Sequence, residues 1–248
     1  MRSSPEIIAH RGFSALAPEN TLASMERAIE AGAEGLEWDV RIAACGTPVA
    51  IHDARLDRTS NGKGEVGRTS WDVLAELDAG SWFSPTYAGE PIPTLAQILA
   101  RIRRWTGRGY PEIKAWNDRA DLHHMVSMVR EAGLGDRITF ISMEVEALRE
   151  IRAVAPHVEV APVVDSRRGF ASGLQAALEL APAFLDVDHR ILAAHPALAE
   201  EALDAGVELG VWTVNQPREA EALWAQGVTR FTTNEVAVLN RWAQSLSG

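Results

Sequence analysis

Short runs rich in valine, isoleucine and leucine recur along the chain and alternate with stretches in which apolar residues follow helical spacing. Buried strands of parallel sheets have such nearly continuous apolar runs. The runs predicted as strands are EIIAH (6–10), GLEWDV (35–40), YPEIK (110–114), RITFIS (137–142), VEVAPVV (158–164), AFLDVD (183–188), ELGVWTV (208–214) and TRFTT (229–233). The ranges predicted as helices are 21–31, 94–105, 120–132, 144–154, 196–205 and 218–226. This alternation predicts an α/β fold in which eight parallel strands close into a (β/α)8 TIM barrel.

One additional apolar run, PVAIHD at 48–53, follows the second predicted strand after only RIAACGT. A connection this short cannot make a parallel crossover, so the two strands are expected to form a hairpin. A two-residue turn at Cys45 and Gly46 would set His52 opposite Asp39. The hairpin is therefore expected to bring His52 beside the end of the second strand.

The segment from about 54 to 92 shows no alternation of strands and helices. It is rich in glycine and turn residues and contains one predicted short helix near 71–77. Irregular insertions of this length are usually functional. Because the chain has 248 residues and 46% of them are hydrophobic, we expect a single barrel domain over 1–248 that carries this segment as an insertion.

Composition restricts the partners of the chain. Its 24 lysine and arginine residues against 34 aspartate and glutamate residues give a net charge of −10, which disfavours nucleic acid and anionic membranes. Cys45 is the single cysteine, so no intramolecular disulfide can form. The sequence shows no secretory leader pattern, and no uncharged apolar run reaches roughly 18 residues. We therefore expect a cytoplasmic protein with no nucleic-acid partner and no stable membrane association; the pattern gives no expectation for the oligomeric state.

Polar residues are concentrated at the carboxyl ends of the predicted strands, where the active sites of barrels lie. These residues are His10 and Arg11 after the first strand, Glu37 and Asp39 on the second, His52 on the hairpin, and Glu112 and Lys114 on the third. Spacings of two place both members of a pair on one face of a strand. Trp212 near the end of a later strand either stacks on a ligand or belongs to the core. Asn20 and Thr21 are expected to cap the following helix or to border the site.

This set of side chains suits metal-assisted phosphate chemistry. Three buried carboxylates (Glu37, Asp39 and Glu112) repel one another unless a cation or a proton compensates. Oxygen ligands alone favour one hard divalent cation, Mg²⁺ or Ca²⁺. Arg11 and Lys114 would contact a phosphate, while the two histidines provide a general acid and a general base. The alternative is a structural network in which the two cations simply pair with the carboxylates.

Several passages together carry a family resemblance. They are AHRG with PENT (9–12, 18–21), GLEWDV (35–40), VAIHD with LDRTSNGKGEV (49–53, 56–66), LDAGSWF with GEPIPTL (77–83, 89–95), EIK (112–114) and WTVN (212–215). In these passages, spread over nearly the whole chain, the sequence resembles the glycerophosphodiester phosphodiesterases, particularly the cytosolic bacterial type. One departure is FTTNE after the last strand, where the family usually has Thr-Asp, so that Asn234 stands in place of the aspartate.

The resemblance implies a function for the residues already selected by position. It implies a TIM barrel with a cap after His52, catalysis by His10 and His52, metal binding by Glu37, Asp39 and Glu112, and phosphate contacts from Arg11 and Lys114. The implied reaction converts glycerophosphodiesters, which are deacylated phospholipid head groups, to sn-glycerol 3-phosphate and an alcohol. Two alternatives are a phospholipase D-like lyase acting on lysophospholipids and a non-catalytic phosphodiester-binding barrel. The head group, the choice between Mg²⁺ and Ca²⁺ and the nature of the nucleophile stay open.

Overall fold

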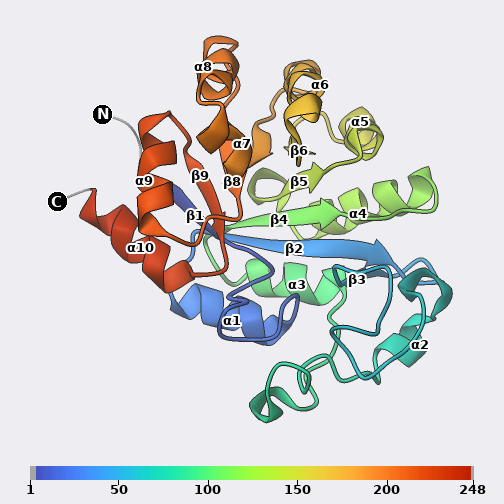
Figure 1. Cartoon of the computed structure of the whole chain (residues 1–248). Coiled ribbons are helices and arrows are strands. Elements are labelled where there is room, and N and C mark those ends of the chain that lie inside the picture. Colours follow the sequence, from blue (N-terminus) through green and yellow to red (C-terminus); the bar gives the residue numbers. More distant parts are fainter. Residues whose placement is uncertain (1–3, 247–248) are drawn as a thin grey trace.

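The computed structural model describes residues 4–246, and its centre is a closed barrel of eight parallel strands (Figure 1). The barrel strands are β1 (Glu6–Ala9), β2 (Gly35–Ile42), β4 (Arg108–Ile113), β5 (Thr139–Ser142), β6 (Glu159–Val164), β7 (Leu185–Asp188), β8 (Leu209–Trp212) and β9 (Arg230–Thr233). β1 pairs in parallel with both β2 and β9, which closes the sheet. The predicted TIM barrel is therefore confirmed, and each barrel strand lies within or overlaps a predicted run.

Helices surround the barrel on its outer face (Figure 1). They are α1 (Leu22–Glu30), α3 (Leu95–Ile102), α4 (Arg119–Glu131), α5 (Val145–Val154), α6 (Arg167–Glu179), α7 (His189–Ala194), α8 (Ala197–Asp204), α9 (Pro217–Ala225) and α10 (Val236–Ser245). α6, α7 and α10 are not among the predicted ranges. In α6 two glycines weaken the helical signal, but a Cβ at Gly173 would lie 2.4 Å from Val164 Cγ2. Close packing of this helix on β6 therefore requires the glycine.

The interior of the barrel is layered. Near the amino ends of the strands, Arg230 forms ion pairs with Glu6 and Glu159. Above them lies an apolar layer that includes Ile8, Tyr110, Ile141, Ala161, Val163 and Phe184. Such filled layers make a TIM barrel a packed core rather than a pore. The polar residues at the carboxyl ends of the strands therefore stand on an apolar floor.

The hairpin is present, but its turn differs from the prediction. The additional strand β3 (Pro48–Ala50) pairs antiparallel with β2, and the connecting loop has three residues, 44–46. Gly46 has a φ of 83°, the left-handed conformation that ends many three-residue hairpin loops. The register is consequently shifted by one residue, and the Ile51 N–H, not His52, bonds to the Asp39 carbonyl at 3.0 Å. The prediction that His52 pairs opposite Asp39 is wrong.

Residues 51–94, here called the β3–α3 segment, contain only short helical turns. These are η1 (Val66–Arg68), α2 (Trp71–Leu74) and η2 (Pro85–Tyr87). Leu56, Val66 and Leu74 form a small apolar cluster with Val49 of β3, so the segment has a core of its own that includes part of the hairpin. Figure 1 shows the segment with α2 beside β3. Across residues 4–246, no helix is both long and apolar enough to cross a membrane.

Candidate active site

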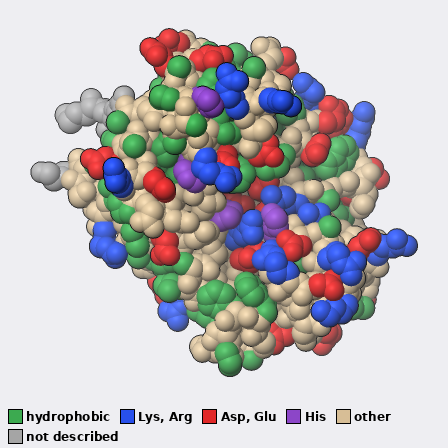
Figure 2. Space-filling model, viewed as in Figure 1, with side chains coloured by type: hydrophobic (Ala, Val, Ile, Leu, Met, Phe, Trp, Pro, Cys, Tyr) green, Lys and Arg blue, Asp and Glu red, His purple; other side chains and the backbone are tan. Residues whose placement is uncertain are grey.

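A cavity of about 250 Å³ opens at the carboxyl end of the barrel. Its lining includes seven of the eight predicted site residues: His10, Arg11, Glu37, His52, Glu112, Lys114 and Trp212. The eighth, Asp39, is fully buried behind them and contacts both Arg11 and Lys114. Figure 2 shows histidine, basic and acidic side chains meeting in a hollow near the middle of this face. Residues from distant parts of the sequence thus converge as predicted, because parallel strands end on one rim.

Three carboxylates form the base of this group. Glu37 and Asp39 come from β2, and Glu112 of β4 lies in register with Asp39. One oxygen from each of the three side chains lies within 4.8 Å of the others, and all three residues are buried. Within residues 4–246, Glu37 Oε1 has no hydrogen-bond partner. An oxygen-only set with an unpartnered buried oxygen fits a hard divalent cation, so this triad can hold a metal ion.

The cationic side chains around the triad do not compensate its three carboxylates equally. Lys114 Nζ lies 2.7 Å from Glu112 Oε1 and 3.3 Å from Asp39 Oδ1, and Arg11 Nε lies 3.1 Å from Asp39 Oδ2. Although burial opposes it, Arg11 and Lys114 lower the pKa of Asp39. Burial, followed by repulsion from Asp39 and Glu112, raises the pKa of Glu37 well above its ordinary value. The alternative network of carboxylates paired with Arg11 and Lys114 is thus present, yet Arg11 offsets the charge of Glu37 only in part, and a cation would take the place of a proton there.

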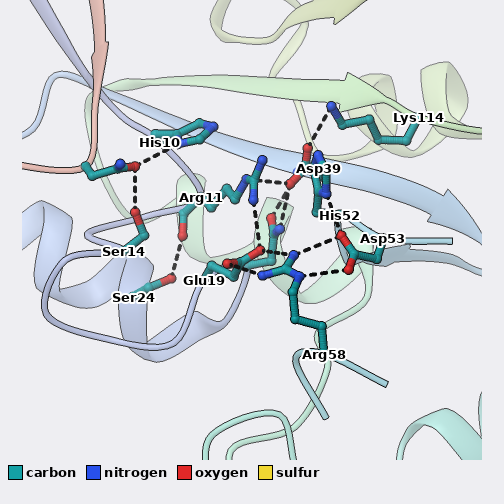
Figure 3. A network of polar contacts seen from close by, with 12 residues as sticks. His10, Arg11, Ser14, Glu19, Ser24, Asp39, His52, Asp53, Arg58 and Lys114 are labelled. Carbon is teal, nitrogen blue, oxygen red and sulfur yellow. Dashed lines mark hydrogen bonds and ion pairs between the residues drawn. The ribbon is translucent and has the colours of Figure 1, made fainter. Parts of the chain in front are cut away.

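His10 is held by a neutral partner. Its Nδ1 lies 2.7 Å from Asn234 Oδ1, and the Ser14 hydroxyl donates to the same oxygen at 2.9 Å (Figure 3). Because an amide oxygen can only accept, Nδ1 carries the hydrogen and Nε2 keeps a free lone pair. Burial and then the adjacent Arg11 lower the pKa of His10 to about 4. The ring is therefore prepared to accept a proton at neutral pH.

His52 is held by a charged partner. Its Nδ1 lies 2.7 Å from Asp53 Oδ1. Arg58 donates to both oxygens of Asp53 at 2.7 and 2.9 Å and to both oxygens of Glu19 at 2.8 Å (Figure 3). Hydrogen bonds from Arg58, reinforced by the bond to His52, hold the pKa of Asp53 well below its usual range. The β3–α3 segment thus supplies an ionised carboxylate to this ring and is joined to the loop after β1.

The turn after β1 explains the Arg-Gly sequence that follows His10. Arg11 has a φ of 56° and Gly12 a φ of 77°, which tightens the turn so that the Arg11 N–H donates to Glu37 Oε2 at 2.8 Å. A Cβ at Gly12 would lie 2.3 Å from Ser24 Oγ, so only glycine fits. The Arg11 guanidinium also pairs with Glu19 at 2.9 Å. Its position on the cavity wall is therefore fixed by two carboxylates besides Glu37.

Comparison with known proteins agrees with this arrangement. The model of the glycerophosphoryl diester phosphodiesterase family matches residues 10–238. The chain belongs to this family. A glycerophosphodiester phosphodiesterase of Caldanaerobacter subterraneus subsp. tengcongensis is 31% identical over 94% of this chain and 95% of its own length. A second, from Bacillus subtilis, is 29% identical over 92% of this chain and 82% of its own length. The resemblance stated from the sequence is confirmed.

Solved structures of this family share the fold. A phosphodiesterase of Oleispira antarctica, solved in complex with the product sn-glycerol-3-phosphate, has a TM-score of 0.85, with 28% identity over 97% of each chain. A glycerophosphodiester phosphodiesterase of Agrobacterium tumefaciens has a TM-score of 0.81, with 26% identity over 97% of this chain and 99% of that chain. The family barrel therefore extends over essentially the whole length of this sequence.

Two residues of the site, Asn20 and Asp186, were predicted from the sequence only in part or not at all. Thr21 caps α1 as expected, accepting from the Ser24 N–H, but Asn20 instead holds Asp39. Asn20 Nδ2 donates to Asp39 Oδ2 at 2.7 Å, and the Asp39 N–H donates to Asn20 Oδ1 at 2.9 Å.

Asp186 of β7 lines the cavity but is not among the predicted site residues. Its signal in the sequence is the pair Asp186 and Asp188, two acidic residues spaced by two in a mostly apolar run. Trp212 packs on the barrel core and also lines the cavity, so its stacking on a ligand stays a prediction.

Proposed function

We propose that this chain hydrolyses glycerophosphodiesters to sn-glycerol 3-phosphate and an alcohol with the help of one divalent cation, Mg²⁺ or Ca²⁺. The observation that carries the proposal is that two histidines, His10 and His52, line one cavity together with a buried carboxylate triad. Mere binding of a phosphodiester requires no pair of proton-transfer groups. Support also comes from the Oleispira relative, which was solved with sn-glycerol-3-phosphate as its product.

Charge complementarity orients the substrate in this proposal. Arg11 and Lys114 line the cavity and present cationic groups to the phosphate. Glu37, Asp39 and Glu112 would hold the cation, which when bound supplies Lewis-acid stabilisation of the charge that grows on the phosphate oxygens. Asn20 fixes Asp39 through two hydrogen bonds. Preorganised cations of this kind lower the barrier because they need no reorganisation during the reaction.

We infer the roles of the two histidines from their hydrogen-bond partners. His10 carries its hydrogen on Nδ1 toward Asn234, so its Nε2 is the general base that takes the proton of the nucleophile. His52 forms an ion pair with Asp53 when protonated and is the general acid that protonates the leaving alkoxide. The nucleophile is either the adjacent hydroxyl of the substrate, which gives a cyclic phosphate, or water. Trapping of a cyclic phosphate, or the position of oxygen-18 incorporated from water, distinguishes the two.

The test is a coupled assay for glycerol 3-phosphate. Purified protein is incubated with glycerophosphocholine, glycerophosphoethanolamine or glycerophosphoglycerol, each with Mg²⁺, with Ca²⁺ or with a chelator. We expect release of glycerol 3-phosphate from at least one substrate, loss of release with chelator, and recovery when the cation is added back. Absence of release from all three substrates with either cation would overturn the proposal.

A further inference from the structure

Asp186, in the middle of β7, lines the cavity but has no role in the chemistry described above. Its side chain is buried, with 4% of the residue exposed. Within residues 4–246 its carboxyl group has no hydrogen-bond partner, and the charges that act on it are those of Glu112 and, with opposite sign, Arg230. A buried carboxyl group without a hydrogen bond is costly. Its exposure to the cavity leaves a ligand as the natural partner.

The barrel keeps space for this carboxyl group. Asp186 is in register with Gly210 of β8, and a Cβ at Gly210 would lie 2.9 Å from Asp186 Oδ1. The apolar layer of the barrel, which includes Phe184, lies below it. Asp186 is therefore a polar group on the floor of the cavity, at a position where the neighbouring strand carries no side chain.

The surroundings restrict the kind of ligand group that Asp186 can take. A phosphate oxygen is disfavoured, because Asp186 lies in the field of Glu112 and the cationic side chains of the cavity are Arg11 and Lys114. Among the described residues, the group of acidic side chains that could hold a metal ion is the triad alone, without Asp186. A hydroxyl group suits the position, because it donates to a carboxylate and accepts from a carboxylic acid.

The walls and the size of the cavity agree with this choice. Ile141, Val163 and Trp212 line it beside Asp186 and suit the C–H groups of a short carbon chain. A volume of about 250 Å³ lies below the range of roughly 300–1,000 Å³ that is typical of pockets for larger ligands. Burial, followed by repulsion from Glu112, raises the pKa of Asp186 to about 8, but a hydroxyl can bond to either form of the group.

We propose that Asp186 binds a hydroxyl group of the glycerol moiety at the floor of the cavity and so selects glycerol-bearing phosphodiesters. The inference rests on the proposed function and makes Asp186 a specificity-determining residue. A site built to bond a hydroxyl discriminates against analogues that lack it, because its own polar group is then left unpaired.

The test compares substrates with and without each glycerol hydroxyl. The variants are Asp186→Leu, which removes the polar group, and Asp186→Asn, which keeps hydrogen bonding. The matched control is Asp188→Asn on the same strand, because Asp188 is buried, caps α7 and does not line the cavity. Steady-state kinetics use glycerophosphocholine and its two analogues that each lack one glycerol hydroxyl. Calorimetric titrations use sn-glycerol 3-phosphate and inorganic phosphate, and thermal melting checks the fold of every variant.

We expect Asp186→Leu to raise KM for glycerophosphocholine about tenfold with little change in kcat, as for loss of uniform binding. For the analogue that lacks the bound hydroxyl, the wild-type protein and Asp186→Leu should have the same KM. Asp186→Asn should lie between wild type and Asp186→Leu, and the Asp188→Asn control should stay close to wild type. Binding of glycerol 3-phosphate should weaken about tenfold in Asp186→Leu, while binding of inorganic phosphate stays unchanged.

Other outcomes overturn the inference. An unchanged KM for glycerophosphocholine in Asp186→Leu excludes a substrate contact, and an equal loss on all three substrates, or on both titrated ligands, indicates a general structural role. Failure of the proposed function has a separate signature, namely a wild-type protein that turns over none of the substrates. In that case the difference between glycerol 3-phosphate and phosphate binding still decides the role of Asp186.

Discussion

The two halves of the site are built differently. The His10 half comes from the barrel, where the ring bonds to the neutral Asn234 after β9. The His52 half comes from the β3–α3 segment, where 34% of the His52 side chain is exposed and its partner is the ionised Asp53. The His10 half thus holds its histidine by packing and neutral hydrogen bonds. The His52 half holds its histidine through Asp53, which is linked by Arg58 to Glu19. The difference shows how one cavity can place two like residues beside partners of unlike charge.

Removal of either histidine has the largest expected effect. His10→Ala and His52→Ala should each lower kcat about 10²- to 10⁴-fold, the range for loss of one general acid or base. The double variant should lose little more than the worse single variant, because the two groups act as a unit. His124→Ala is the matched control, since His124 is exposed on α4. A single variant that keeps more than a tenth of wild-type kcat contradicts the assignment.

The next largest effect is expected from removal of the two hydrogen bonds between Asn20 and Asp39, which tests the His10 half of the site. Asn20→Ala loses both hydrogen bonds to Asp39 and should weaken binding of the divalent cation about 10- to 100-fold, as for other groups that orient a metal ligand. The measurement is calorimetric titration with Mg²⁺ or Ca²⁺ after a melting experiment has confirmed the fold. An unchanged affinity would show that Asp39 needs no orienting partner.

Weakening of the ion pairs that Arg58 makes with Asp53 and Glu19 tests the His52 half of the site. Arg58 joins Asp53 to Glu19, so Arg58→Ala should misplace His52 and lower kcat about 10- to 100-fold. Arg58→Lys keeps the charge but not the bidentate geometry and should lie between wild type and Arg58→Ala. Because these ion pairs join residues of the site itself, high salt should lower kcat less than either substitution of Arg58 does. A drop in kcat that salt alone reproduces would point to long-range attraction of the substrate instead.

The sequence predicted the barrel and the members of the site because both depend on repeated, local patterns. Apolar runs mark buried strands, and strand ends share one rim, so the pattern alone places His10, Glu37 and Glu112 together. The failures were of a different kind. The hairpin register depended on whether the turn has two or three residues, which Gly46 allows either way. The roles of Asn20 and Asp186 depend on tertiary contacts between segments that are separated in the sequence, and α6 depends on a glycine that close packing requires.

Replacement of Asn234 has the smallest expected effect on rate and addresses the contrast between the halves most directly. Asn234→Asp places a carboxylate on His10 Nδ1 and makes its partner resemble that of His52. A carboxylate at this distance should raise the pKa of His10 from about 4 by about 1–3 units. The base must be unprotonated, so the low-pH limb of kcat/KM should move to higher pH, with activity reduced below pH 6 and less affected at pH 8. Titration of His10 by NMR measures the shift directly.

Stability supplies an independent readout of the same change. In the wild-type protein the pKa of His10 lies below its ordinary value of 6.5, so the folded state binds fewer protons than the unfolded state between these values. The contribution of His10 to stability is therefore present above pH 6.5 and is lost as the pH falls toward 4. Asn234→Asp should reduce this loss, and denaturant unfolding at pH 7 and pH 5 measures it. An equal dependence on pH in both proteins would mean that Asn234 does not determine the protonation of His10.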